Sequence, residues 1–268
     1  MVHRILIVTA VAAEADSVSA GLGLGAPELL PLPGGLVLRR HTDAPGDRVL
    51  VDVLVGGVGP AAVAASTGTA LAYAALTGTA NHTENSTENR AESLTETPYG
   101  LVVSAGIAGG FQPLAPLGSV VVSSAVVAAD LGAQTPDGYL TVDELGFGRS
   151  VHPVPEALQG RIAAALDAAG LPHTVGPVLT VSTVTGTADR AAELAGRHPG
   201  AAAEAMEGFG VAEAAAAYGV PVVEIRAVSN AVGPRDRAAW RIGEALHALR
   251  HTFELLSKTV FLELEPSP

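Results

Sequence analysis

Near the start of the chain stands the run Arg-Ile-Leu-Ile-Val-Thr-Ala (RILIVTA, residues 4–10), which is apolar at consecutive positions. A strand with one face in water alternates apolar and polar side chains, so consecutive apolar positions are typical of a strand covered on both faces. Such strands lie in the middle of a sheet that has helices on either side. The run therefore predicts a central sheet between two layers of helices.

Runs of the same kind recur along the chain and alternate with longer Ala-rich segments of helical length. Further strands are expected at 48–55, 100–105, 119–127, 175–181 and 221–228. Helices are expected at 61–76, 156–169, 188–196, 207–218 and 238–261. This alternation predicts a single domain over residues 1–268, of class α/β, with three layers in the order α/β/α.

One segment, residues 78–98 (GTANHTENSTENRAESLTETP), interrupts the alternation because it contains almost no apolar side chains. It has too little apolar surface to offset the entropy lost on ordering. We expect a flexible, polar surface insertion there.

The composition excludes several classes of protein. Of 268 residues, 15 are Lys or Arg and 27 are Asp or Glu, which gives a net charge of −12. An acidic chain is not expected to bind nucleic-acid phosphates or an anionic membrane surface. The absence of Cys excludes disulfides, a thiol nucleophile and thiolate metal sites. No apolar run approaches the ~20 residues that span a bilayer, so we expect a cytoplasmic protein without a membrane partner.

A glycine-rich turn at residues 57–62 (GVGPAA) fits the G-x-G-x-x-A pattern of dinucleotide-binding folds. However, Pro60 removes one N–H donor from the phosphate cradle, and no strand ending in an acid follows at the required distance. A tight strand–helix turn is therefore favoured over a nicotinamide or flavin site, and no cofactor is expected. The eight His residues lack the spacing of a metal site, so no metal is expected either.

Polar side chains occur where expected strands and helices meet. Glu14 follows the first strand, Glu207 opens a helix, and Asn230 follows the strand at 221–228. The segment 104–110 (SAGIAGG) predicts a loop of small residues against which a flat ligand lies. Because ligands of open α/β sheets bind outside the carboxyl ends of the strands, we expect these groups to meet at one edge.

These motifs together resemble the purine nucleoside phosphorylase/nucleosidase superfamily. The residues that carry the resemblance are Ala10 to Glu14, Ala105-Gly106-Ile107-Ala108-Gly109-Gly110, Ala205-Met206-Glu207-Gly208 and Val228-Ser229-Asn230. The likeness is greatest to its N-ribosyl hydrolases, the methylthioadenosine/S-adenosylhomocysteine nucleosidases and, from the segment 204–240, the futalosine hydrolases. It implies a central mixed sheet, a small-molecule nucleoside substrate, a homo-oligomer and, for futalosine hydrolases, a place in menaquinone biosynthesis.

The resemblance also implies roles for individual residues. Glu14 matches the carboxylate that activates water, and Glu207 the one that binds the ribose hydroxyls. Met206 matches the residue beneath the sugar, Ala108 and Gly109 the backbone that lines the base, and Asn230 the catalytic residue at purine N7. Two positions depart from the nucleosidase pattern, since Ala205 stands for a Glu and Asn230 for an Asp.

The amide of Asn230 favours one class of base. A 6-oxopurine presents the acceptor O6 beside N7, and a carboxamide donates its NH₂ to O6 while its oxygen accepts from N7–H. Asn230 therefore predicts a hypoxanthine leaving group, as in futalosine, rather than adenine.

Hydrolysis is favoured over phosphorolysis because the residues after the first strand offer Glu14 instead of Arg and Gly. A phosphate site is not excluded, because it could be formed by Arg39, Arg40 or Arg149. The alternatives are an adenine-releasing nucleosidase, a purine nucleoside phosphorylase, and a nucleoside-binding protein without catalysis.

Overall fold

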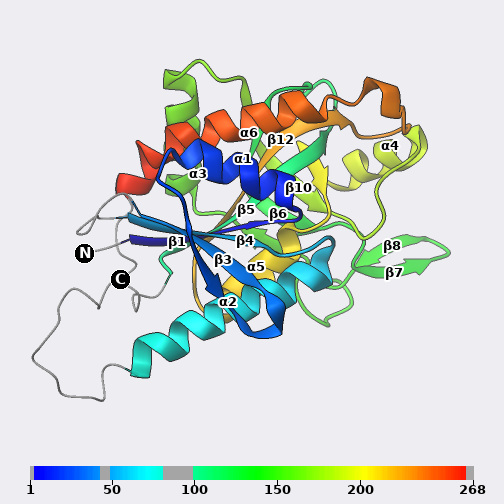
Figure 1. Cartoon of the computed structure of the whole chain (residues 1–268). Coiled ribbons are helices and arrows are strands. Elements are labelled where there is room, and N and C mark those ends of the chain that lie inside the picture. The colour runs from blue at the N-terminus through cyan, green and yellow to red at the C-terminus, as the bar shows by residue number, and fades with distance from the viewer. Residues whose placement is uncertain (1–2, 43–48, 81–98, 264–268) are drawn as a thin grey trace, which may run out of the picture.

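The computed structural model describes residues 3–42, 49–80 and 99–263 and is built on a mixed ten-stranded sheet (Figure 1). Nine of its strands lie in the order β11-β10-β6-β12-β5-β1-β4-β3-β2, and β9 pairs with β6. A separate hairpin is made by β7 and β8. The strands are β1 (His3–Thr9), β2 (Glu28–Pro31), β3 (Val37–His41), β4 (Val49–Val55), β5 (Leu101–Gly110), β6 (Val120–Ala128), β7 (Gly132–Thr135), β8 (Gly138–Thr141), β9 (Val151–Pro153), β10 (His173–Thr180), β11 (Ala203–Ala205) and β12 (Val222–Ala231).

The middle of the sheet is parallel and one end of it closes on itself. β1 runs parallel to β4 and β5, and β5 runs parallel to β12. β11 is parallel to β10 and antiparallel to β5, so β5, β12, β6, β10 and β11 form a closed ring of strands. The interior of the ring holds small side chains from all five strands, and these belong to the cluster Ala108, Ala115, Val121, Val178, Ala202, Ala203, Ala205 and Val228.

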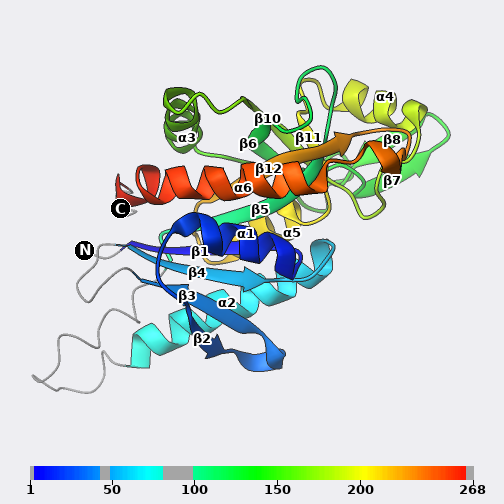
Figure 2. The ribbon, with the colours of Figure 1, turned by 45° about the horizontal axis from the view of Figure 1, so that its top comes forward.

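Helices cover both faces of the sheet, as Figures 1 and 2 show. α1 (Ala12–Leu22), α3 (Glu156–Ala168) and α6 (Ile242–Ser257) pack together on one face. α2 (Pro60–Ala80) and α5 (Gly208–Ala217) pack together on the other, and α4 (Ala188–Arg197) lies beyond the closed end. The predicted α/β/α order and the mixed central sheet are confirmed. Among the described residues, no helix has the length and apolar character that crossing a membrane requires.

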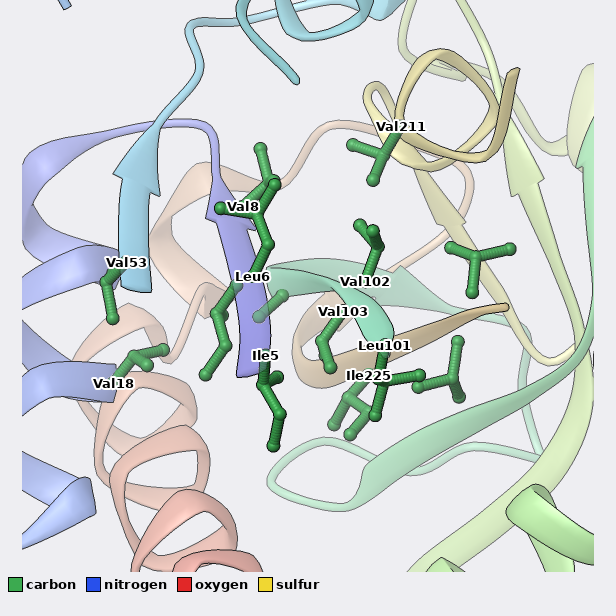
Figure 3. Packing of buried hydrophobic residues seen from close by; sticks show 14 of the residues in the cluster. Ile5, Leu6, Val8, Val18, Val53, Leu101, Val102, Val103, Val211 and Ile225 are labelled. Atoms are coloured by element: carbon green, nitrogen blue, oxygen red, sulfur yellow. The ribbon is translucent and has the colours of Figure 1, made fainter. Parts of the chain in front are cut away.

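The core forms where β1 and β5 are covered on both sides. Ile5, Leu6 and Ile7 are fully buried although they are consecutive, as a doubly covered strand requires. Figure 3 shows Val18 of α1 and Val211 of α5 on opposite sides of these strands. Each such side chain contributes about 1.5–3 kcal/mol on burial, so β1 anchors both helical layers.

Most expected elements are present, and three differ. The residues 104–110 do not form a loop, because β5 continues through them to Gly110 and pairs with β12 and β11. The expected helix at 238–261 is three pieces, a 3₁₀ turn at Arg237–Ala239, α6, and a 3₁₀ turn at Val260–Glu263. The first three residues of the polar segment 78–98 end α2. Its remainder, 81–98, lies outside the described residues, and the expectation of one domain stays a prediction.

Candidate active site

A buried arginine on β12 lies at the centre of the candidate site. Arg226 is only 1% exposed, and its Nε donates to Glu224 Oε1 at 2.7 Å. Its Nη2 lies 3.2 Å from Glu207 Oε2 and donates to the hydroxyl of Ser104 at 3.2 Å. Burial alone would lower the pKa of Arg226, but the carboxylates around it outweigh burial and raise that pKa above its ordinary value. The guanidinium is therefore always positively charged, and it pairs with the acidic side chains around it.

Glu14 reaches this arginine from the first turn of α1. Its Oε2 accepts from the backbone N–H groups of Ala10 and Val11 at 3.0 and 3.3 Å. Its Oε1 accepts from the N–H of Ile107 on β5 at 2.9 Å. The first turn of a helix favours a carboxylate through its free N–H groups and its dipole. The side chain is thus held at 4% exposure, at the expected strand-to-helix junction.

Glu14 and Arg226 share the space above one glycine. A Cβ on Gly106 would lie 2.5 Å from Glu14 Oε1 and 2.6 Å from Arg226 Nη1, so these two atoms are at most 5.1 Å apart. A side chain at this position would displace both groups. The glycines of this segment therefore serve close approach within a strand, which explains why the expectation of a loop was wrong.

Glu207 meets the same arginine from the start of α5. Its Oε1 accepts from the N–H of Gly59 at 3.3 Å, and its Oε2 faces Arg226. Gly57 and Gly59 have φ values of 95° and 90°, which few other residues adopt. The sequence 57–62 is therefore the expected tight turn between β4 and α2, and it also donates to a site carboxylate.

Glycines beside Glu207 bring its helix close to the site. A Cβ on Gly208 would overlap the carboxylate of Glu224, and a Cβ on Gly210 would overlap the carbonyl of Pro60. Met206 is half-buried between β11 and Glu207, and its N–H lies 3.3 Å from Glu207 Oε2. The segment 205–210 thus positions Met206 and Glu207 together.

Asn230 lies further along β12, beside Gly109. The two residues are paired in register, and a Cβ on Gly109 would lie 3.2 Å from Asn230 Nδ2. The Ser229 hydroxyl donates to Asn230 Oδ1 at 2.8 Å, and Asn230 Nδ2 donates to Ala231 O at 2.9 Å. The amide keeps one N–H and one oxygen lone pair free, which is the pair of groups that O6 and N7–H of a 6-oxopurine would use. Ala108, by contrast, is 6% exposed and belongs to the cluster inside the strand ring.

The structure thus brings Glu14 and Glu207 together through Arg226 and places Asn230 against Gly109. Arg226, Glu224 and Ser104 also belong to the site and are not among the residues predicted from the sequence. Two charged side chains at alternate positions of an otherwise apolar strand, VVEIRAV, were the available signal. No group of three or more His, Cys, Asp or Glu side chains in the described residues is arranged to hold a metal. A cavity of about 510 Å³ lies elsewhere, beside Leu22, Arg250 and Phe261, and none of the expected site residues lines it.

Comparison with known proteins shows the family of the chain. The family model of the phosphorylase superfamily matches residues 5–260. The chain belongs to the phosphorylase superfamily.

Two relatives within the phosphorylase superfamily span nearly all of the chain. A futalosine hydrolase from Streptomyces coelicolor is 54% identical over 252 residues, which cover 92% of each chain. One from Acidothermus cellulolyticus is 43% identical and covers 94% of this chain and 89% of its own. The native structure of futalosine hydrolase from Helicobacter pylori superposes with a TM-score of 0.74 at 18% identity, over 98% of this chain and 99% of that one. That last likeness shows a shared fold, and the resemblance found from the sequence is confirmed.

Proposed function

We propose that this phosphorylase-superfamily member hydrolyses the N-glycosidic bond of futalosine and releases hypoxanthine. The observation that carries the proposal is that Glu14 and Glu207 both lie beside the buried guanidinium of Arg226. Asn230 lies further along β12, the strand that carries Arg226. The names of the two full-length relatives support futalosine as the substrate. They also support a hydrolase rather than a nucleoside-binding protein.

In the proposed reaction the bond from C1′ to N9 breaks as a water oxygen bonds to C1′. Glu207 accepts from the ribose hydroxyls and Met206 lies beneath the sugar. Glu14 takes the proton of the attacking water, a role that contributes about 10²–10⁴-fold. Asn230 holds the departing base while N7 takes a proton from solvent, and Glu14 later returns its own proton to solvent. Ala108 and Gly109 line the base with backbone.

The charges favour water over phosphate as the nucleophile. Arg226 is engaged by Glu224, Glu207 and Ser104, so its guanidinium is not free for an anion. The arginines that the sequence left open for phosphate also face carboxylates: Arg39 lies 2.6 Å from Asp16, Arg40 lies 2.9 Å from Asp52, and Arg149 lies 3.9 Å from Glu213. Glu14 and Glu207 would repel a phosphate at the reacting carbon and stabilise positive charge there.

The test is an assay of free base with futalosine, inosine and methylthioadenosine, each with and without phosphate. We expect hypoxanthine from futalosine at a rate that does not depend on phosphate. Dependence on phosphate would indicate a phosphorylase, and preferred release of adenine would indicate a methylthioadenosine/S-adenosylhomocysteine nucleosidase. Absence of any base release, with nucleoside binding retained, would indicate a binding protein.

We also propose that the enzyme works in the cytoplasm, in menaquinone biosynthesis, as a homo-oligomer. Exposed apolar side chains on and around the β7–β8 hairpin support a subunit interface there. Phe147 is 82% exposed, and Leu131 and Leu140 are 44% and 38% exposed. Figure 1 shows this hairpin projecting from the body of the molecule. Light scattering of the purified protein tests the oligomeric state, and a monomer that retains full activity would contradict the proposed homo-oligomer.

A further inference from the structure

Three residues on adjacent strands of the ring lie in one row. Glu204 of β11 is paired with Gly109 of β5, and Gly109 is paired with Asn230 of β12. Residues opposite one another on neighbouring strands present their side chains to the same face of a sheet. Gly109 has no side chain, so Glu204 and Asn230 flank partly exposed backbone across two strand spacings, roughly 9.5 Å. Val232 borders the same face, since its Cγ2 would lie 3.0 Å from a Cβ on Gly109.

The packing of the neighbouring residues fixes which face this is. Ala203 and Ala205, on either side of Glu204, belong to the cluster inside the ring, as does Ala108 next to Gly109. Because side chains alternate along a strand, Glu204 and Gly109 face away from that interior. The closeness of Asn230 Nδ2 to the Cβ direction of Gly109 places Asn230 on the same face. The carboxylate and the amide therefore flank the place where the proposed function puts the base.

Glu204 is a buried carboxylate without an ion pair among the described residues. It is 5% exposed, and its Oε1 accepts from the N–H of Thr185 at 2.9 Å. Its Oε2 accepts from the hydroxyl of Thr185. Burial raises the pKa of Glu204, against the opposing effect of the Thr185 hydrogen bonds. Each carboxylate oxygen has a second acceptor position, so the group is anchored and still able to accept from a ligand.

A 6-oxopurine offers a donor that this carboxylate fits. Its N1 carries a hydrogen next to O6, whereas N1 of a 6-aminopurine carries a lone pair. We propose that Glu204 accepts the N1–H of the base while Asn230 meets O6 and N7, so that the two side chains together select hypoxanthine. This rests on the proposed function, because it assumes a purine over Gly109. An adenine would set its N1 lone pair against the carboxylate and give Glu204 no donor beyond Thr185, and a buried site penalises such a contact between two acceptors.

The test measures the binding of free bases by calorimetry, with hypoxanthine and 1-methylhypoxanthine, in which a methyl group replaces the N1 hydrogen. The proteins are the wild type, Glu204→Gln, Glu204→Ala and Thr185→Val, with Glu193→Gln on the exposed face of α4 as a surface control. We expect the wild type to prefer hypoxanthine by roughly 10- to 100-fold, since a hydrogen bond to a charged group is lost with the methyl compound. The preference should fall about tenfold in Glu204→Gln, fall further in Glu204→Ala, and persist in Thr185→Val.

A purely structural role for Glu204 predicts a different pattern. If Glu204 only holds the segment at Thr185, then Thr185→Val and Glu204→Ala would weaken both bases equally and leave the preference unchanged. That result would overturn the inference, and Glu204→Gln, which keeps the size of the side chain, decides the matter if Glu204→Ala does not fold. A wild type that prefers hypoxanthine through Glu204 yet releases no base from futalosine would refute the proposed substrate and keep the base-reading role.

Discussion

The Nη2 atom of Arg226 lies 3.2 Å from Oε2 of Glu207, and both side chains are almost completely buried. One residue comes from the middle of β12 and the other from the start of α5. Their contact joins the sheet to a helix on the face covered by α2 and α5. The same guanidinium lies beside Glu14, which comes from the helix on the opposite face. The three side chains tie the two helical layers to the sheet at one place.

Removing Arg226 should cost stability as well as activity. Arg226→Met would leave Glu224 and Glu207 buried without their cation, which costs about 3–5 kcal/mol in proteins where one partner of a buried pair is lost. The free energy of unfolding in urea measures this. Arg190→Met is the matched control, because the pair of Arg190 with Glu193 is partly exposed and should contribute less than about 1 kcal/mol. Equal losses of unfolding free energy in the two variants would contradict the proposed role of the ion pairs of Arg226.

Replacing the proposed general base should separate turnover from binding. We expect Glu14→Gln to lower kcat for futalosine by about 100- to 10,000-fold, because the amide no longer takes a proton from water. Affinity for the substrate should fall much less than kcat, because Gln keeps the size of the side chain, although its NH₂ would face a backbone N–H that the carboxylate accepts from. Stopped assays of hypoxanthine release measure kcat, and Asp16→Asn on the same helix is the control. A near-normal kcat in Glu14→Gln would remove Glu14 from the mechanism.

The space above Gly106 provides a third prediction. Gly106→Ala would place a methyl group 2.5 Å from Glu14 Oε1 and 2.6 Å from Arg226 Nη1. We expect activity to be lost and stability to fall by about 1–3 kcal/mol, the usual cost of overpacking. Gly160→Ala is the contrasting variant, because Gly160 lies within α3 and its added Cβ meets nothing. That substitution should raise the free energy of unfolding by about 0.5–1 kcal/mol and leave kcat unchanged.

The amide of Asn230 should decide between the two classes of purine. Asn230→Asp is expected to lower kcat/KM for futalosine by roughly 10- to 100-fold, because a carboxylate faces O6 instead of an NH₂ donor. The ratio of kcat/KM for methylthioadenosine to that for futalosine should rise. Asn230→Ala, which removes the amide without adding an acceptor for a 6-amino group, should lower both values. An unchanged ratio in Asn230→Asp would refute the pairing of the amide with the base.

Acid should weaken the fold through Asp52. Burial raises the pKa of this carboxyl, but hydrogen bonds from Arg40 and the charges of Arg4 and Arg40 outweigh it, so the pKa lies below its ordinary value. A carboxyl with a lowered pKa in the folded state stabilises the fold above its unfolded pKa, and that contribution is lost as the pH falls through the folded value. Unfolding free energies between about pH 5 and pH 2 should fall less steeply in Asp52→Asn than in the wild type. Equal slopes would contradict this account.

Much of the fold was predictable because buried strands have a strong pattern. RILIVTA and VVEIRAV are apolar at most positions, and each is a central strand. β11 has three residues, too few for any pattern to show, although it closes the ring and carries Glu204. From the sequence, the glycines of β5 predict a loop, because glycine normally weakens a strand. Gly106 is needed because Glu14 and Arg226 lie close to it, and these residues come together only when distant segments of the chain pack in the fold.

The site was predictable where side chains stand at the ends of elements. Glu14, Glu207 and Asn230 each follow a recognisable boundary, so their meeting could be inferred from sheet topology. Arg226 and Glu224 lie inside a strand, and the neighbouring sequence does not indicate what a charged pair there would contact. Only the approach of Glu207 and Glu14 gives that pair its role.

The central claim, that water rather than phosphate attacks the sugar while hypoxanthine leaves, is tested most directly by isotope labelling. Futalosine is incubated with the wild-type enzyme in ¹⁸O-enriched water containing phosphate, and the sugar product is analysed by mass spectrometry. We predict hypoxanthine together with dehypoxanthine futalosine that carries one ¹⁸O atom. A sugar 1-phosphate without the label, or the release of no base, would contradict the account.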